Sequence, residues 1–176
     1  MIYTLRLNQH PDPTDLKALL SRVWNESTEF IGARAASGNY IIQYELTPLE
    51  GRSFNVELCV FVNLQEALAK GFYNDFELAR AVSEDVLQEV VVSTHTDDPY
   101  LWVLLRKGAA YLFESADMGD DSIVVPEDRL TPLKIDAIQQ HHVGRESIEE
   151  ALRHNQNDVP VFLKADSWWR AEAKTS

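Results

Sequence analysis

The sequence has little of several features that mark common classes of protein. Cys59 is the single cysteine among 176 residues, so no disulfide can form within the chain, and a reducing cytoplasmic compartment is expected. No apolar run approaches the roughly 18 residues that a membrane-spanning helix needs. Polar and apolar residues alternate over residues 1–7, which is typical of a strand and not of a signal peptide. These absences predict a cytoplasmic protein without a membrane partner.

Motifs for catalysis and cofactor binding are also missing. The chain has no glycine-rich phosphate loop and no Gly-x-Ser-x-Gly turn, and Cys59 lies in an apolar run that predicts burial. Residues 117–122 place carboxylates around a glycine, but their spacing differs from that of a calcium loop. His141 and His142 are adjacent and would point to different sides of a helix. We therefore expect no catalytic residue, no metal site and no cofactor, and a role other than catalysis is favoured.

Basic residues are scarce in one stretch of the chain. Residues 73–129 carry 13 Asp or Glu and 4 Lys or Arg, a net charge of −9 out of −12 for the whole protein. Residues 1–72 and 130–176 have net charges of only −2 and −1. A local excess of acid attracts basic partners and repels polyanions within about a Debye length. It predicts a basic protein partner and argues against direct binding to nucleic acid.

Hydrophobic periodicity predicts a strand at the N-terminus followed by a helix. Asp12 can cap this helix, Pro13 suits its first position, and apolar residues at helical spacing predict that it continues to Gly32. Two β-rich runs follow, over residues 39–46 and 52–62. The first unit is therefore predicted to be βαββ.

A second unit of a helix and several strands is predicted after residue 63. Asn74 can cap its main helix, and Lys107-Gly108 is a strong signal for a tight hairpin turn. The other expected elements are a short helix over 64–70, a β-branched run at 90–92, hairpin strands over 100–105 and 109–113, and a strand over 123–125 that Pro126 ends.

The predicted fold class is α+β, a single domain with a mostly antiparallel sheet and helices packed on one side. Residues 1–130 form its core and residues 131–176 a helical C-terminal extension, with helices over 132–142 and 146–154. Within the extension, Trp168 and Trp169 are adjacent and cannot both face one core from a short helix. An exposed tryptophan there would mark a contact surface, so these residues predict a homo-oligomer contact.

The acid-rich helix and hairpin over residues 74–125 resemble bacterial immunity proteins, which bind and neutralise a cognate toxin domain. The stretch begins with Asn74-Asp75-Phe76-Glu77 and includes Asp98-Pro99-Tyr100-Leu101-Trp102. The resemblance implies an inhibitor, and fixed carboxylates can steer onto the basic cleft of an enzyme that attacks nucleic acid and occlude it. The predicted partner-binding residues are Asp97, Asp98, Asp117, Asp120 and Asp121, with Tyr100 or Trp102 as an aromatic anchor.

Two alternatives from other functional classes remain open. One is a small-molecule-binding protein or enzyme with a pocket between the helices and the sheet. The other is an assembly or adaptor subunit that associates through Trp168 and Trp169.

Overall fold

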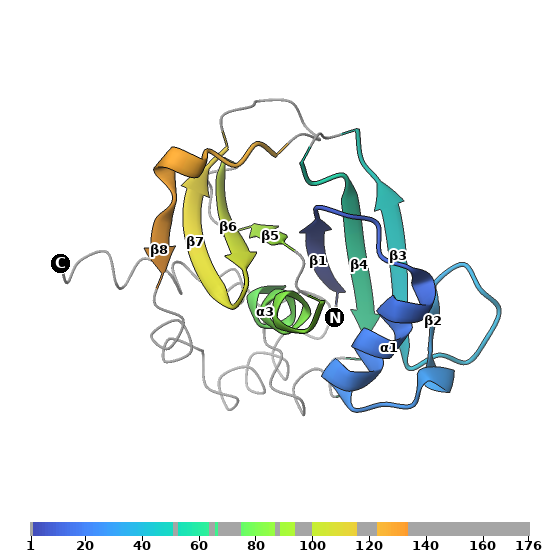
Figure 1. Cartoon of the computed structure of the whole chain (residues 1–176). Helices are drawn as coiled ribbons and strands as arrows, with labels where there is room; N and C mark the ends of the chain where they lie inside the picture. Colours follow the sequence, from blue (N-terminus) through green and yellow to red (C-terminus); the bar gives the residue numbers. More distant parts are fainter. Residues whose placement is uncertain are drawn as a thin grey trace, which may run out of the picture.

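A single eight-stranded sheet organises the described part of the chain. The computed structural model describes residues 2–50, 53–63, 66, 75–86, 89–93, 100–115 and 123–133. The elements, labelled as in Figure 1, are β1 (Ile2–Leu7), α1 (Pro13–Trp24), η1 (Thr28–Phe30), β2 (Ile31–Ala33), β3 (Ile42–Pro48), β4 (Val56–Val62), α3 (Asp75–Val86), β5 (Val90–Ser93), β6 (Leu101–Arg106), β7 (Ala109–Glu114), η2 (Glu127–Arg129) and β8 (Thr131–Leu133).

The strands follow the order β2-β3-β4-β1-β5-β6-β7-β8 across the sheet. Every neighbouring pair is antiparallel except β2 and β3, which run parallel. The N-terminal strand β1 lies near the centre, between β4 and β5, so the two sequence units share one sheet. The protein is therefore a single α+β domain with a mostly antiparallel sheet, as the sequence predicts.

Both helices cover the same face of this sheet (Figure 1). Alternate residues of β1 and β4 point into a core that they share with the apolar stripes of α1 and α3. Leu20 and Trp24 of α1 and Leu78 and Val82 of α3 are almost completely buried there. Each such side chain stabilises the fold by about 1.5–3 kcal/mol relative to an exposed position. The predicted packing of the helices on one side is confirmed for the described residues.

A smaller core lies on the opposite face, over β5, β6 and β7. It contains Val91, Leu104 and Phe113 from these strands, together with Phe54 and Ile123. Val125 and Leu130 pack against its margin, so the stretch 123–130 runs over this face without joining the ladder beneath it. Apolar residues therefore bury both faces of the central part of β6.

Helix α1 ends earlier than the sequence predicts. Its apolar spacing extends towards Gly32, but the helix stops at Trp24 because Asn25 takes a left-handed conformation with φ of 51°. The backbone N–H of Asn25 then donates to the carbonyl of Arg22, which closes the helix. The apolar residues that continue the helical spacing instead form η1 and the edge strand β2, where Ile31 is buried against β3.

The prediction of a strand over 123–125 is wrong, and so is the start of the predicted helix over 132–142. The side chain of Ile123 is buried, but its backbone does not pair with any described strand. The position beside β7 is occupied by β8. Pro132 suits this edge strand because it needs no N–H partner there. Residues 131–133, which the sequence assigns to the C-terminal extension, thus belong to the sheet. Residues 134–176 and the helix predicted over 64–70, apart from Glu66, lie outside the described residues.

The hairpin of β6 and β7 forms where the sequence predicts it. Lys107 and Gly108 both have positive φ values, 51° and 78°, which is the geometry of a two-residue type I′ turn. The turn pairs Arg106 with Ala109 and fixes the register of the whole hairpin. That register decides which residues meet at the other end of the hairpin.

Candidate binding site at the end of the β6–β7 hairpin

The end of the hairpin away from its turn brings together Ser93, Tyr100, Ser115 and Val124. These residues lie at or next to the ends of two acid-rich connections, 94–99 and 116–122. Trp102 pairs with Ser93, the last residue of β5, and the Ser115 N–H donates to the Tyr100 carbonyl at 2.9 Å. The Val124 N–H in turn donates to Oγ of Ser115 at 3.3 Å. The described residues on either side of 94–99 and of 116–122 therefore lie at this end of the hairpin.

The predicted carboxylates themselves belong to these two connections. Asp97, Asp98, Asp117, Asp120 and Asp121 lie outside the described residues. Their role in binding therefore stays a prediction. The structure describes the residues on either side of the two connections that contain them.

The two predicted aromatic anchors differ in exposure. Tyr100 is 40% exposed at the head of β6. Trp102 is half-buried against the smaller core, and the guanidinium carbon of Arg6 lies 5.4 Å from the centre of its ring. Arg6 also approaches Glu57 on β4, at 3.8 Å. Trp102 therefore already has a cation–π partner within the sheet, and Tyr100 is the aromatic residue that presents more surface to a partner.

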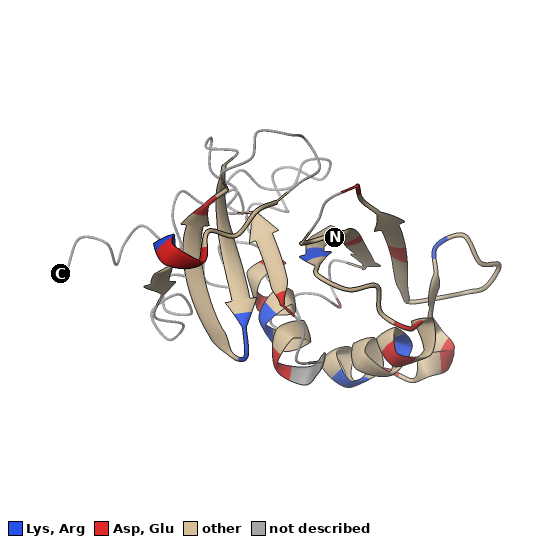
Figure 2. Ribbon diagram, turned by 45° about the horizontal axis from the view of Figure 1, so that its top comes forward, with Lys and Arg blue, Asp and Glu red and all other residues tan. Residues whose placement is uncertain are grey.

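Three of the four basic side chains in residues 73–129 are paired with carboxylates of the same stretch. Arg80 contacts Glu84 at 3.0 Å, and Arg129 lies 3.8 Å from Asp128. Arg106 contacts both Glu89 and Glu127, while Lys107 is exposed in the hairpin turn. The short helix η2 is largely acidic, as its colour in Figure 2 shows. The three arginines of this stretch are thus engaged locally, with carboxylates of the stretch itself.

Arg106 joins three separate parts of the chain. Its Nη1 and Nη2 donate to the two carboxylate oxygens of Glu127 at 2.9 and 2.7 Å, and its Nε side contacts Glu89. These hydrogen bonds raise the pKa of Arg106 and lower the pKa of the Glu127 carboxyl, since both favour the charged forms. The bidentate pair ties η2 to the end of β6 and so helps to position the stretch that follows β7.

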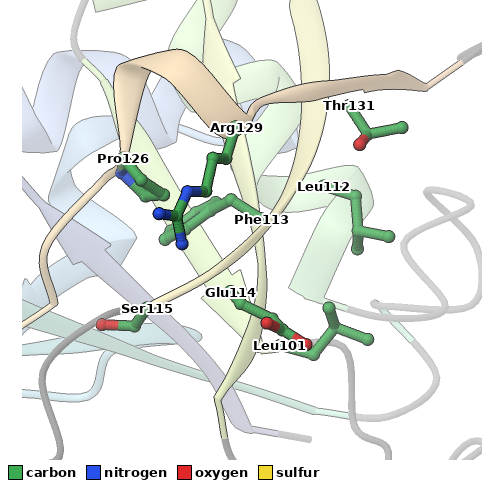
Figure 3. Close-up of a pocket in the computed structure, with 8 residues that line it drawn as sticks. All are labelled: Leu101, Leu112, Phe113, Glu114, Ser115, Pro126, Arg129 and Thr131. Atoms are coloured by element: carbon green, nitrogen blue, oxygen red, sulfur yellow. The ribbon is translucent and has the colours of Figure 1, made fainter.

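A pocket of about 310 Å³ lies beside the same end of the hairpin. Its walls come from β6, β7, η2 and the start of β8, and the residues that line it are Leu101, Leu112, Phe113, Glu114, Ser115, Pro126, Arg129 and Thr131 (Figure 3). Leu101 pairs directly with Glu114, and Leu112 pairs with Thr131. Apolar and polar groups therefore alternate across its floor.

Two opposite charges line this pocket at different places. In Figure 3 the carboxylate of Glu114 lies beside Leu101, whereas the Arg129 side chain extends towards Pro126. Glu114 is exposed and has no ion-pair partner among the described residues. The charge of Arg129 is partly balanced by the neighbouring Asp128. The sequence alone could not assemble this pocket, because its residues meet only through the strand register and the path of 123–130 across the sheet.

The rest of the described structure offers no metal centre or activated nucleophile. The described ranges contain no group of three or more His, Cys, Asp or Glu side chains that could hold a metal ion. Cys59 is half-buried on the face of the sheet opposite the helices, and burial raises the pKa of its thiol. Of the helices that can be described, none has the length and apolar character needed to cross a membrane.

Comparison with known proteins yields no match to a family model, a curated protein or a solved structure.

Proposed function

We propose that this protein is a protein-binding module of the immunity or inhibitor type, which captures a basic partner at the end of the β6–β7 hairpin. The observation that carries the proposal is the meeting of Ser93, Tyr100, Ser115 and Val124 at this end, through paired strands and two hydrogen bonds. The two connections that they flank contain Asp97, Asp98, Asp117, Asp120 and Asp121. In the sequence, five carboxylates thus lie in connections that are attached to one end of the hairpin.

The electrostatics of the surrounding residues support the same proposal. Arg80, Arg106 and Arg129 each contact a carboxylate of their own stretch, whose net charge is −9 with these arginines counted. A field of this kind speeds the approach of a basic protein and weakens as salt is added. Tyr100, which directly follows the 94–99 connection in the sequence, adds an exposed aromatic ring, and tyrosine is enriched among residues that contribute strongly to binding.

The proposal is tested by removing charge without removing volume. The variant Asp97→Asn/Asp98→Asn/Asp120→Asn/Asp121→Asn neutralises four carboxylates of the two connections. A matched control, Asp15→Asn/Glu29→Gln/Glu45→Gln/Glu50→Gln, neutralises four exposed carboxylates elsewhere. The partner is isolated by stoichiometric co-purification with the wild-type chain, and association rates are measured by stopped flow at low and high ionic strength.

We expect the first variant to associate with the partner at least tenfold more slowly than wild type at low salt, and the control to change the rate far less. The difference between the variants should shrink as the ionic strength rises. Equal rates for wild type and the first variant at low salt would overturn the proposal. The acidic excess would then serve solubility alone.

The pocket favours a second candidate, a small-molecule-binding protein. Its volume of about 310 Å³ is at the lower end of the range for ligand sites, and its lining combines apolar side chains with a few polar groups. Native mass spectrometry of the protein purified from its own cells distinguishes the two candidates. A bound metabolite of defined mass would favour the ligand-binding function, and a bound basic protein would favour the inhibitor.

A further inference from the structure

We infer that the pocket beside Glu114 receives a lysine or arginine side chain of the basic partner. The inference rests on the proposed function, because it assigns a specific contact to the partner captured at this end of the hairpin. It concerns the described residues Leu101, Leu112, Glu114 and Thr131, which share one face of β6, β7 and β8.

The pocket has the layout that a long basic side chain requires. Such a side chain has an apolar stem of three or four methylene groups and a charged head. Leu101 and Leu112 are half-buried and offer apolar surface to the stem. Glu114 lies directly opposite Leu101 in the hairpin register, and its exposed carboxylate can accept hydrogen bonds from the head.

The charges around the pocket favour a cation at the end where Glu114 lies. Glu114 has no ion-pair partner among the described residues, so an entering cation does not have to displace one. The positive charge of Arg129 is partly neutralised by Asp128 at 3.8 Å, and its side chain extends towards Pro126 (Figure 3). The hydroxyl of Thr131, exposed on the opposite wall next to Leu112, is a further acceptor.

The pocket wall is held in place independently of any ligand. The Ser115 hydroxyl accepts the Val124 N–H, the Arg129 N–H donates to the Pro126 carbonyl at 2.9 Å, and Glu127 is held by Arg106. A preformed wall lowers the entropic cost of ordering the site on binding. The pocket therefore suits a side chain that enters as an anchor after long-range attraction has brought the partner close.

The experiment uses n-butylguanidinium as a probe of the arginine head and stem, and n-butyrate as an anion of similar size. Each is titrated into the full-length protein at constant ionic strength, and backbone amide shifts are followed by NMR. We expect n-butylguanidinium to bind in the millimolar range and to shift the amides of Leu112, Ser115 and Thr131. Glu114→Gln should weaken this binding about fivefold, whereas Arg129→Gln should leave it unchanged or strengthen it. Glu45→Gln serves as a charge-matched control far along the sheet.

Binding of n-butyrate that Arg129→Gln abolishes would overturn the inference, because the pocket would then be an anion site. Absence of n-butylguanidinium binding, or equal binding by wild type and Glu114→Gln, would overturn it too. Because Glu114 and Arg129 are exposed, both variants should fold, and circular dichroism checks this.

Failure of the pocket inference can be told apart from failure of the proposed function. The probes report on the pocket without a partner protein, whereas the four-Asp variant reports on partner capture. If that variant slows association while the pocket ignores n-butylguanidinium, the inference fails and the proposed function stands. If the pocket binds n-butylguanidinium in a Glu114-dependent manner but the four-Asp variant associates at the wild-type rate, the proposed function fails.

Discussion

Replacement of Ile123 by alanine tests how the stretch 123–130 is held on the sheet. Ile123 is 3% exposed and packs in the smaller core with Val91, Leu104 and Phe113. The neighbouring Val124 is 37% exposed and points away from this core. Adjacent residues in an extended segment face opposite sides, so the pair forms a matched test of one structural feature.

The expected cost follows from the burial of each side chain. Truncation of a buried isoleucine to alanine costs about 2–5 kcal/mol, and the small size of this cluster places Ile123→Ala near the lower end, at about 2–3 kcal/mol. Val124→Ala should change stability by less than about 0.5 kcal/mol because its side chain is exposed and lies outside the smaller core. For a protein of this length, about 2–4 °C per kcal/mol predicts a fall in Tm of about 4–12 °C for Ile123→Ala.

Urea denaturation followed by circular dichroism measures both variants against wild type. The midpoint should move for Ile123→Ala while the slope of the transition stays constant, since only stability changes. Equal effects of the two substitutions would show that 123–130 does not pack on the sheet through Ile123.

Other substitutions test the main core, the Arg106 contact and the lone cysteine. Leu20→Asp should prevent folding, because it places an unpaired carboxylate at a fully buried position of α1; a cooperative unfolding transition near the wild-type Tm would contradict this. The pKa of Glu127 is lowered in the folded protein, so its ionised form contributes stability above the unfolded pKa that is lost as the pH falls through the folded pKa. Glu127→Gln should therefore destabilise the protein at pH 7 by no more than about 1 kcal/mol, since Glu127 is largely exposed, and should have less effect at pH 3. An equal loss of stability at both pH values, measured by urea denaturation, would show that the ion pair with Arg106 is not its cause. Cys59→Ala should leave partner binding intact and lower stability only modestly, and a folded variant that no longer binds the partner would show that the thiol takes part.

Local patterns predicted the elements whose sequence signals act within a few residues. The Lys107-Gly108 turn, the cap at Asp12 and the apolar stripe of α3 depend on backbone preferences and on periodicity, and all three appear in the structure. The sequence does not locate the end of α1, because Asn25 can stop a helix in the left-handed conformation while the apolar spacing continues beyond it. Local sequence does not show which of these two features determines the last residue of the helix.

Long-range pairing accounts for what the sequence could not predict. Ile123 and Val125 have the composition of a strand, but β8 occupies the position beside β7 and leaves them to pack by their side chains. The pocket depends on the same arrangement, because Glu114, Arg129 and Thr131 come from three elements that only the sheet brings together. The acidic character of the site, by contrast, follows from composition and was visible in the sequence.

Site-specific photo-crosslinking tests whether the end of the β6–β7 hairpin binds a basic protein. The photoreactive residue p-benzoylphenylalanine is placed at Tyr100, at the proposed site, or at Phe30, an exposed aromatic position beside the edge strand β2. Both variants are irradiated in native cells, and the crosslinked proteins are identified by mass spectrometry. We expect a basic protein to be crosslinked at position 100 and not at position 30, with a yield in lysate that falls as salt is added. Crosslinking of the partner at position 30 alone, or of an acidic protein at position 100, would contradict this expectation.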